Sequence, residues 1–263
     1  MKKVLTFGIL ILMGNLLMAQ TMTIAERTVS AKGTQVNAWV ISVGDNQEMA
    51  KKTFTDFSKK ELKLKPKSQG KMIVVSEEAN LSAISTKRGD FKGIIFSEGN
   101  TYKMGVSFAL GYDIVINSQE YPAEMAALRD VTIDYMKFHY TRYYDEALEK
   151  KERERSKFEK QVKQTEKEIS TLRASNKRSE KRIYKTEDQA VELELQNKIA
   201  QNKLTIENLN QKLPGLNHQI EQKNEEITET KNEYNDVMAQ IRALRTAMVS
   251  EAPEAYDELE DIY

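Results

Sequence analysis

The sequence lacks cysteine, so no disulfide bond can form and no cysteine can carry a lipid in any of its 263 residues. It has only two histidines, His139 and His218, and neither has partner ligands at a spacing typical of a metal site. It also lacks a glycine-rich phosphate loop and a Ser-His-Asp arrangement at a suggestive spacing. We therefore expect no catalytic, cofactor-binding or metal-binding residues, and a protein that is not an enzyme.

A net charge is also missing, because 40 Lys and Arg residues balance 40 Asp and Glu residues. The chain thus has neither an overall basic field that would attract nucleic acid nor an acidic field that would mimic it. We expect no nucleic-acid partner.

Residues 1–19 have the pattern of a secretory signal peptide: two lysines, then an apolar stretch from Val4 to Leu17, then a small residue at Ala19. The stretch is shorter than the roughly 20 residues that span a bilayer, so an uncleaved anchor is the less favoured alternative. We expect cleavage after Ala19, although Leu17 is large for such a site. The mature chain would be periplasmic or secreted, without an integral membrane span.

Glycine is scarce in the second half of the chain: ten of the eleven glycines lie at or before Gly111. Trp39 and every phenylalanine after Phe7 lie between residues 39 and 158. Because turns need glycine and helices avoid it, strands and turns are expected first and helix afterwards. The sequence predicts a globular domain over residues 20–145.

Short apolar or alternating runs predict the strands of this domain. The runs are TQVNAWVISV (34–43), KMIVVSE (71–77), NLSAIS (80–85), FKGIIFS (91–97) and TYKMGVSFAL (101–110). Gly99-Asn100 predicts a two-residue hairpin between the last two runs, so we expect an antiparallel sheet.

Two helices are expected beside the sheet. Asp45, with Glu48 three residues later, predicts a capping box and a helix over about residues 46–60. A longer helix is expected to begin at Pro122 and to lie across the apolar face of the sheet. The predicted fold class is α+β: an antiparallel sheet with one short and one long helix, followed by a long α-helical coiled coil.

This order of elements behind a secretory signal resembles small secreted bacterial domains of unknown function with a TBP-like, or helix-grip-like, fold. The resemblance covers residues 22–145 and rests on the topology and on the stretches GKMIVV and FKGIIFSEGNTYKMGVSF. It implies a fold and no particular chemistry.

Residues 146–250 are dominated by Glu, Lys, Gln, Asn, Leu and Ile, which is typical of a coiled coil. Apolar residues recur there at steps of three and four, in a seam whose polar positions are Asn202, Lys223 and Thr230. The thirteen apolar seam residues are Leu195, Ile199, Ile206, Leu209, Leu213, Leu216, Ile220, Ile227, Tyr234, Val237, Ile241, Leu244 and Met248. If the helix continues as a rod, a second chain is needed to cover the seam, and Asn202 and Lys223 are then expected to set the register of the packing.

Pro214 and Gly215 interrupt this seam, and inside a helix the pair would cost on the order of 4 kcal/mol. We therefore expect a break at 213–216, with an antiparallel hairpin favoured over a kinked rod. The kinked rod remains an alternative, because the apolar residues keep their three-and-four spacing through Pro214 and Gly215, as a continuous helix requires. An upstream seam from Leu148 to Ile183 is out of phase with the main one, so the packing is expected to change near 184–192.

Five aromatic residues gather where the two regions meet: Tyr135, Phe138, Tyr140, Tyr143 and Tyr144. They are candidate interaction residues, since aromatic side chains are favoured at interfaces. The alternative is that they pack the long helix against the sheet and form a collar at the junction. Residues 251–263 form a tail with six acidic residues and no basic one, which is typical of a solvated segment.

These features favour a non-enzymatic protein of the cell envelope that uses a coiled-coil arm for self-association or for binding a protein partner. The alternative is a binder of an apolar ligand or a periplasmic holdase-type chaperone. Neither function requires a cofactor.

Overall fold

A computed structural model describes residues 22–31, 33–111 and 114–251. The chain divides into two compact units. We call them the sheet unit, up to Arg142 and from Asn235 onward, and the helical unit, Tyr143–Tyr234. The expected signal peptide at 1–19, and all of the acidic tail except Glu251, lie outside the described residues. No helix within the described ranges is long and apolar enough to span a bilayer.

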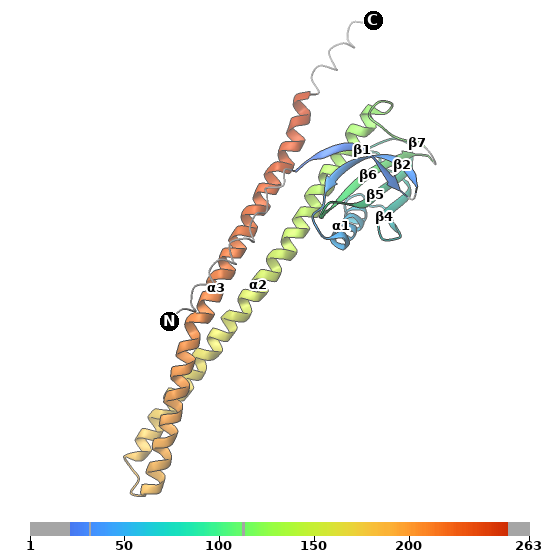
Figure 1. Ribbon diagram of the computed structural model, residues 1–263. Helices are drawn as coiled ribbons and strands as arrows, with labels where there is room; N and C mark the ends of the chain where they lie inside the picture. Colours follow the sequence, from blue (N-terminus) through green and yellow to red (C-terminus); the bar gives the residue numbers. More distant parts are fainter. Residues whose placement is uncertain (1–21, 32, 112–113, 252–263) are drawn as a thin grey trace, which may run out of the picture. The chain divides into compact units, whose positions relative to one another are not determined.

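The sheet unit contains one antiparallel sheet (Figure 1). Its strands are β1 (Ile24–Ala31), β2 (Thr34–Ser42), β3 (Lys67–Gln69), β4 (Ile73–Ala79), β5 (Gly89–Glu98), β6 (Thr101–Leu110) and β7 (Ile114–Val115). Their order across the sheet is β1-β2-β6-β5-β4-β3, and β7 pairs with β6. The predicted α+β class, with an antiparallel sheet and a long helical part, is confirmed.

The hairpin between β5 and β6 turns at the predicted dipeptide. Glu98 pairs with Thr101, and Gly99 adopts a φ of 63°, which glycine accommodates without strain. The prediction of a strand over 80–85 is wrong. Leu81 and Ile84 are both buried at a spacing of three, and the Leu81 carbonyl accepts hydrogen bonds from the next turn of chain, so this run forms a buried turn.

Helix α1 (Gln47–Lys60) begins one residue later than its predicted cap implies. The side chain of Asn46 accepts a hydrogen bond of 2.9 Å from the Met49 amide, so Asn46 is the N-cap in place of Asp45. The helix packs its apolar face on the sheet, where Phe54 lies against Gly93. A Cβ added to Gly93 would come within 2.5 Å of that ring.

Both faces of the sheet carry buried side chains. On the face that holds α1, the Trp39 indole donates a hydrogen bond of 2.8 Å to the Met125 carbonyl of α2 (Pro122–Ile183). The opposite face holds a smaller apolar cluster, formed by Val29, Val36, Ala38, Val40 and Ile94. The second half of β2 is thus buried on both sides, which is why residues 38–41 are all apolar.

Two long helices follow the sheet: α2, with 62 residues, and α3 (Gln189–Glu251), with 63. Helix α2 ends at Ile183, and the chain turns over residues 184–188. Asp188 then caps α3, because its carboxylate accepts a hydrogen bond of 2.9 Å from the Ala190 amide. The phase change expected near 184–192 therefore coincides with the connection between the helices.

The predicted break at 213–216 is wrong, because α3 continues through Pro214. Pro214 and Gly215 lie on an exposed face, whereas the adjacent Leu216 is buried. The local cost of about 4 kcal/mol is offset by apolar side chains on both sides of the pair, whose burial stabilises the fold by roughly 1.5–3 kcal/mol each when complete.

Candidate functional site

The five aromatic candidates are divided between the two units and do not form one exposed surface. Tyr135 and Tyr140 are buried in the sheet unit, and Tyr144 is buried in the helical unit. Phe138 and Tyr143 are half-buried. Their positions agree with the packing alternative, because a contact surface for a partner needs exposed rings.

Tyr135 joins a polar network in the interior of the sheet unit. Its hydroxyl donates a hydrogen bond of 3.1 Å to the Ala50 carbonyl of α1, and its ring lies edge-on to Phe54 with the centroids 5.0 Å apart. Burial raises the pKa of the Tyr135 hydroxyl above its usual value, while a hydrogen bond with Thr53 opposes this shift. This tyrosine anchors α2 on α1 and has no access to solvent.

His139 completes the same network and is fully buried. Its Nε2 lies 3.2 Å from the Val43 carbonyl, which can only accept, so Nε2 carries the hydrogen. The Nδ1 atom of the neutral ring then accepts a hydrogen bond of 2.8 Å from the Thr53 hydroxyl. Burial lowers the pKa of His139 to about 4, against a smaller opposing effect of the Val43 hydrogen bond. The neutral imidazole is a structural link between α2, α1 and the residue that follows β2.

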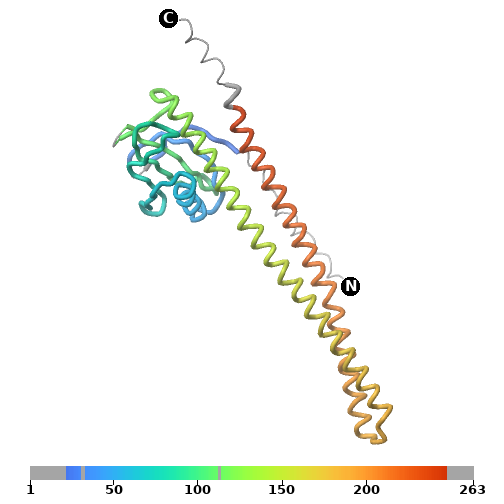
Figure 2. The backbone as a smooth tube through the Cα atoms, turned by 180° about the vertical axis from the view of Figure 1, so that it is seen from behind, coloured from blue at the N-terminus to red at the C-terminus, as the bar shows by residue number. Residues whose placement is uncertain are grey.

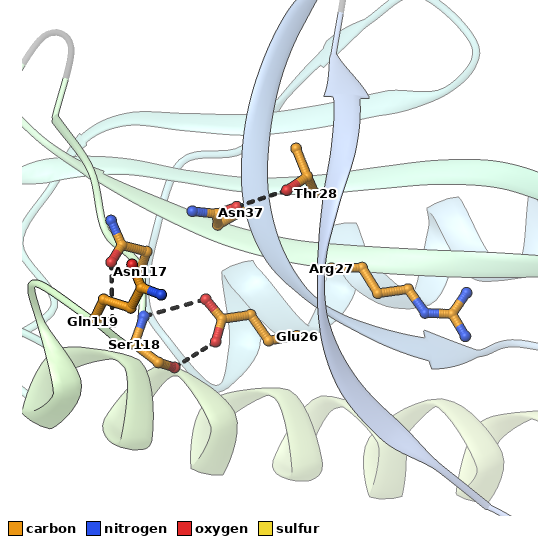
Figure 3. Close-up of a pocket in the computed structure, with 7 residues that line it drawn as sticks. All are labelled: Glu26, Arg27, Thr28, Asn37, Asn117, Ser118 and Gln119. Carbon is orange, nitrogen blue, oxygen red and sulfur yellow. Dashed lines mark hydrogen bonds between the residues drawn. The ribbon is translucent and has the colours of Figure 1, made fainter.

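A shallow pocket of about 430 Å³ lies where β1 and β2 meet the start of α2 (Figure 3). Its lining residues are Glu26, Arg27, Thr28, Asn37, Asn117, Ser118 and Gln119. The backbone amide and the hydroxyl of Ser118 both donate to the Glu26 carboxylate, and the Thr28 hydroxyl donates to Asn37 over 3.0 Å. All seven residues are polar or charged, so the pocket does not suit an apolar ligand.

Within the helical unit α2 and α3 run antiparallel, side by side (Figure 2). Lys151 Nζ donates to the Thr230 hydroxyl over 2.8 Å, and nearer the connection Asn202 Nδ2 donates to Asn176 Oδ1 over 2.7 Å. Residues earlier in α2 thus contact residues later in α3, as an antiparallel pair requires. The chain reverses at 184–188, not at Pro214.

The seam residues of α3 lie on its inner face within this pair. Leu195, Ile199, Leu216 and Ile227 are buried, and Ile206, Leu209, Leu213, Ile220 and Tyr234 are half-buried. In the sheet unit Val237 and Ile241 are buried and Leu244 is half-buried, while the side chain of Met248 lies outside the described residues. The seam is therefore occupied by contacts within one chain.

Lys223 lies on the same inner face and is held by two carboxylates. Its Nζ is 2.9 Å from Glu226 and 3.1 Å from Glu154 of α2, and these hydrogen bonds raise the pKa of Lys223 above its usual value. The ammonium in turn lowers the pKa of Glu154. Lys223 is therefore a polar position that favours one register of α2 against α3 within the chain.

The outward face of α3 carries a feature that the sequence analysis missed. Nine exposed positions, three or four residues apart, follow this face, and none is charged. We call them the outer stripe: Leu193, Asn197, Ala200, Leu204, Asn208, Gln211, Gly215, His218 and Gln222. Leu193 and Leu204 keep 59% and 63% of their surface exposed. The sequence contained this signal, because uncharged residues recur every three or four positions on the side of the helix opposite the apolar seam.

The outward face of α2 contrasts with the outer stripe. Its ten exposed positions at the same kind of spacing are Lys150, Arg153, Lys157, Lys160, Gln164, Lys167, Thr171, Ala174, Arg178 and Lys181. Seven of the ten are cationic. Solvated helix faces are usually charged in this way, so the uncharged face of α3 requires a separate explanation.

No known protein family matches this chain, and neither a curated protein nor a solved structure is significantly similar to it. The resemblance of residues 22–145 to TBP-like secreted domains stays a prediction. In the described ranges, no group of three or more His, Asp or Glu side chains is placed to hold a metal ion.

Proposed function

We propose that the protein is a non-catalytic protein of the periplasm or the extracellular space whose helical unit binds another protein chain. The observation that carries this proposal is the outer stripe of α3. In a chain in which 30% of the residues are charged, nine consecutive outward positions without charge are hydrated less strongly than a charged helix face. A partner helix could cover these positions without removing a charged group from water.

The inner seam cannot serve this purpose while α2 occupies it. Leu195, Ile199 and Leu216 are each at most 8% exposed within one chain, so a partner has no access to them. Association through the helical unit must therefore use an outward face, and the cationic face of α2 would repel a second copy of itself.

The sheet unit would hold the first turns of α2. The buried contacts of Tyr135 and His139 hold α2 to α1 and β2, so the first turns of α2 are tied to the sheet. In this role the sheet would need no catalytic or ligand-binding residues of its own.

The alternative functions receive no specific support. The polar pocket beside β1 does not suit an apolar ligand. A holdase would need a broad apolar surface, whereas the outer stripe contains two leucines and one alanine among nine positions.

The test is site-specific photo-crosslinking in cells that produce the full chain with its own signal sequence. A photoreactive residue replaces Gln211 on the outer stripe or, as the matched control, Gln164 on the outward face of α2. Both glutamines are exposed. We expect a discrete crosslinked product of higher mass from position 211 and none from position 164. Equal products at both positions, or none at position 211, would contradict the proposal.

A further inference from the structure

The sheet unit carries a cluster of positive charge that the proposed function does not use. Six exposed lysines lie between residues 59 and 71, and Glu61 is the only acidic residue in this segment. We call them the lysine surface: Lys59, Lys60, Lys63, Lys65, Lys67 and Lys71. We propose that this surface binds the acidic tail of the same chain, residues 252–263.

Few carboxylates of the sheet unit neutralise the lysine surface. Lys67 Nζ lies 2.8 Å from Glu77, and Lys60 Nζ lies 3.8 Å from Asp56. Within the described residues, the other four take part in no ion pair: Lys59, Lys63, Lys65 and Lys71. Because cations of one sign gathered in this way create a positive potential, the surface attracts an anionic segment.

The tail has the opposite charge and a similar pattern. Residues 252–263 contain five acidic residues and no basic one. Along residues 62–67, exposed lysines alternate with half-buried apolar residues, as Lys63 and Lys65 do on either side of Leu64. In the tail, Glu258 and Glu260 stand on either side of Leu259. If the two segments run side by side, carboxylates of the tail can therefore meet successive ammonium groups.

The tail starts near enough to reach the lysine surface, because α3, α2 and α1 are in contact within the sheet unit. Arg245 of α3 donates to Asp134 of α2 over 2.6 Å, and the rings of Phe138 in α2 and Phe57 in α1 are 5.7 Å apart. The path from the end of α3 to the end of α1, along the helices and across these two contacts, is about 40 Å. The straight line is shorter than this path, and twelve residues of chain span up to about 40 Å.

The covalent connection allows weak ion pairs to hold the tail. A single exposed ion pair contributes little by itself. A connection of so few residues, however, keeps the tail at an effective concentration on the order of millimolar, so several weak pairs formed together suffice. The contact should therefore be sensitive to salt. A bound tail would also neutralise the lysines and weaken the attraction of this surface for other anionic molecules.

The test is zero-length crosslinking of the full exported chain with a carbodiimide, which couples a carboxylate to a lysine amine only where the two meet. Mass spectrometry of the digested protein identifies the coupled residues. We expect the tail to couple to the lysine surface at least about five times more than to Lys157 and Lys160, which are exposed on the outward face of α2. Raising the salt from about 0.05 to about 0.5 M should lower this yield at least about five-fold. The ion pair of Lys67 and Glu77 is the internal positive control.

Two double variants separate the charge of the lysines from their reactivity. Lys63→Gln with Lys65→Gln removes two charges, whereas Lys63→Arg with Lys65→Arg keeps the charges and removes only the amines that couple. The yield of bonds from the tail to Lys60 and Lys71 should fall at least about three-fold in the glutamine variant and should not fall in the arginine variant. Both substituted positions are exposed, and circular dichroism would verify that the fold is kept.

A mixture of chains labelled with ¹⁵N and unlabelled chains shows whether the bonds form within one chain. Bonds that form mainly between chains would overturn the inference. It would also be overturned by a tail that couples equally to the lysines of α2 or to none, by a yield that salt does not change, or by equal losses in the two double variants. None of these results involves the outer stripe, so the proposed function is tested independently.

Discussion

At the scale of single residues, His139 shows how a titratable group can be structural. It lies in a helix whose neighbours are aromatic, and it makes hydrogen bonds through both ring nitrogens to α1 and to the end of β2. Because the ring is fully buried, the charged form is strongly disfavoured. The free energy of folding therefore depends on pH through this residue.

We predict that the free energy of unfolding decreases as the pH is lowered, because the buried His139 resists protonation in the folded chain. Its pKa is lowered from 6.5 to about 4, so the unfolded chain binds a proton in this range that the folded chain does not. The stabilisation is complete above pH 6.5 and is lost as the pH falls toward 4, by at most roughly 3 kcal/mol. Urea unfolding at pH 7.5, 6, 5 and 4 would measure it.

The control for this prediction is His139→Gln, which keeps a polar side chain without an ionisable ring. The variant will be less stable at neutral pH, so the quantity compared is the change with pH and not the absolute value. If the free energy of unfolding changes equally between pH 6.5 and 4 in the wild-type chain and the variant, His139 does not titrate as described.

At the scale of elements, the antiparallel pair of α2 and α3 combines apolar layers with polar ones. Asn176 and Asn202 are bonded to each other between the helices, and Asn176 is 8% exposed. A slip of one helix past the other would leave both amides unpaired, at a cost of about 1–3 kcal/mol each. These layers thus favour one register over its neighbours.

We predict that Asn176→Cys combined with Asn202→Cys forms a disulfide within one chain. The two side chains are bonded across the helices, so the replacement sulfur atoms start close together. Mass spectrometry and non-reducing electrophoresis at low protein concentration would detect the bond and distinguish it from an intermolecular one. Pairing Asn176→Cys with Asn210→Cys, two turns further along α3, is the control. A bond that forms only between different chains would contradict the intrachain pair and favour an extended rod.

At the scale of the whole molecule, the balanced charge hides an uneven distribution. The formal net charge is zero, yet the outward face of α2 is cationic and that of α3 is uncharged. Composition alone therefore says little about partners, because binding depends on which residues share a face. Our proposal of protein association rests on the uncharged outward face of α3.

We predict that the chain is exported and that its mature form begins at Gln20. The lysines, the apolar stretch and Ala19 form the pattern that a signal peptidase reads. N-terminal sequencing of the exported protein, with intact mass, would check the position. A full-length chain that begins with Met1 in the membrane fraction would instead indicate an uncleaved anchor.

Much of the fold could be predicted from the sequence because its signals are local. The turn at Gly99-Asn100, the strands β2 and β6 and the extent of α1 all follow from patterns a few residues long. The strands β1, β3 and β7 were not predicted. Strand β1 lies at the sheet edge, where polar residues such as Glu26 and Arg27 weaken the alternation, and β3 and β7 are three residues or fewer.

The candidate site was predicted less well, because exposure is not a local property. Tyr135 and Tyr140 are tyrosines near a domain boundary, which fits an interface as well as a core. Only their contacts with Ala50 and Ser42 assign them to the interior. The outer stripe was missed for the converse reason: its polar residues look like ordinary surface until the inner face of α3 is known.

The sequence by itself determined the periodicity of the helices, the glycine-poor second half and the inner seam of α3, because each depends on spacing along the chain. Only the tertiary structure decided where the chain reverses. A local rule assigns the break to Pro214, whose penalty is about 3 kcal/mol. The antiparallel pairing of two helices buries side chains on both sides of that residue, and their summed stabilisation exceeds the penalty. The reversal therefore falls at 184–188, where few apolar contacts are lost.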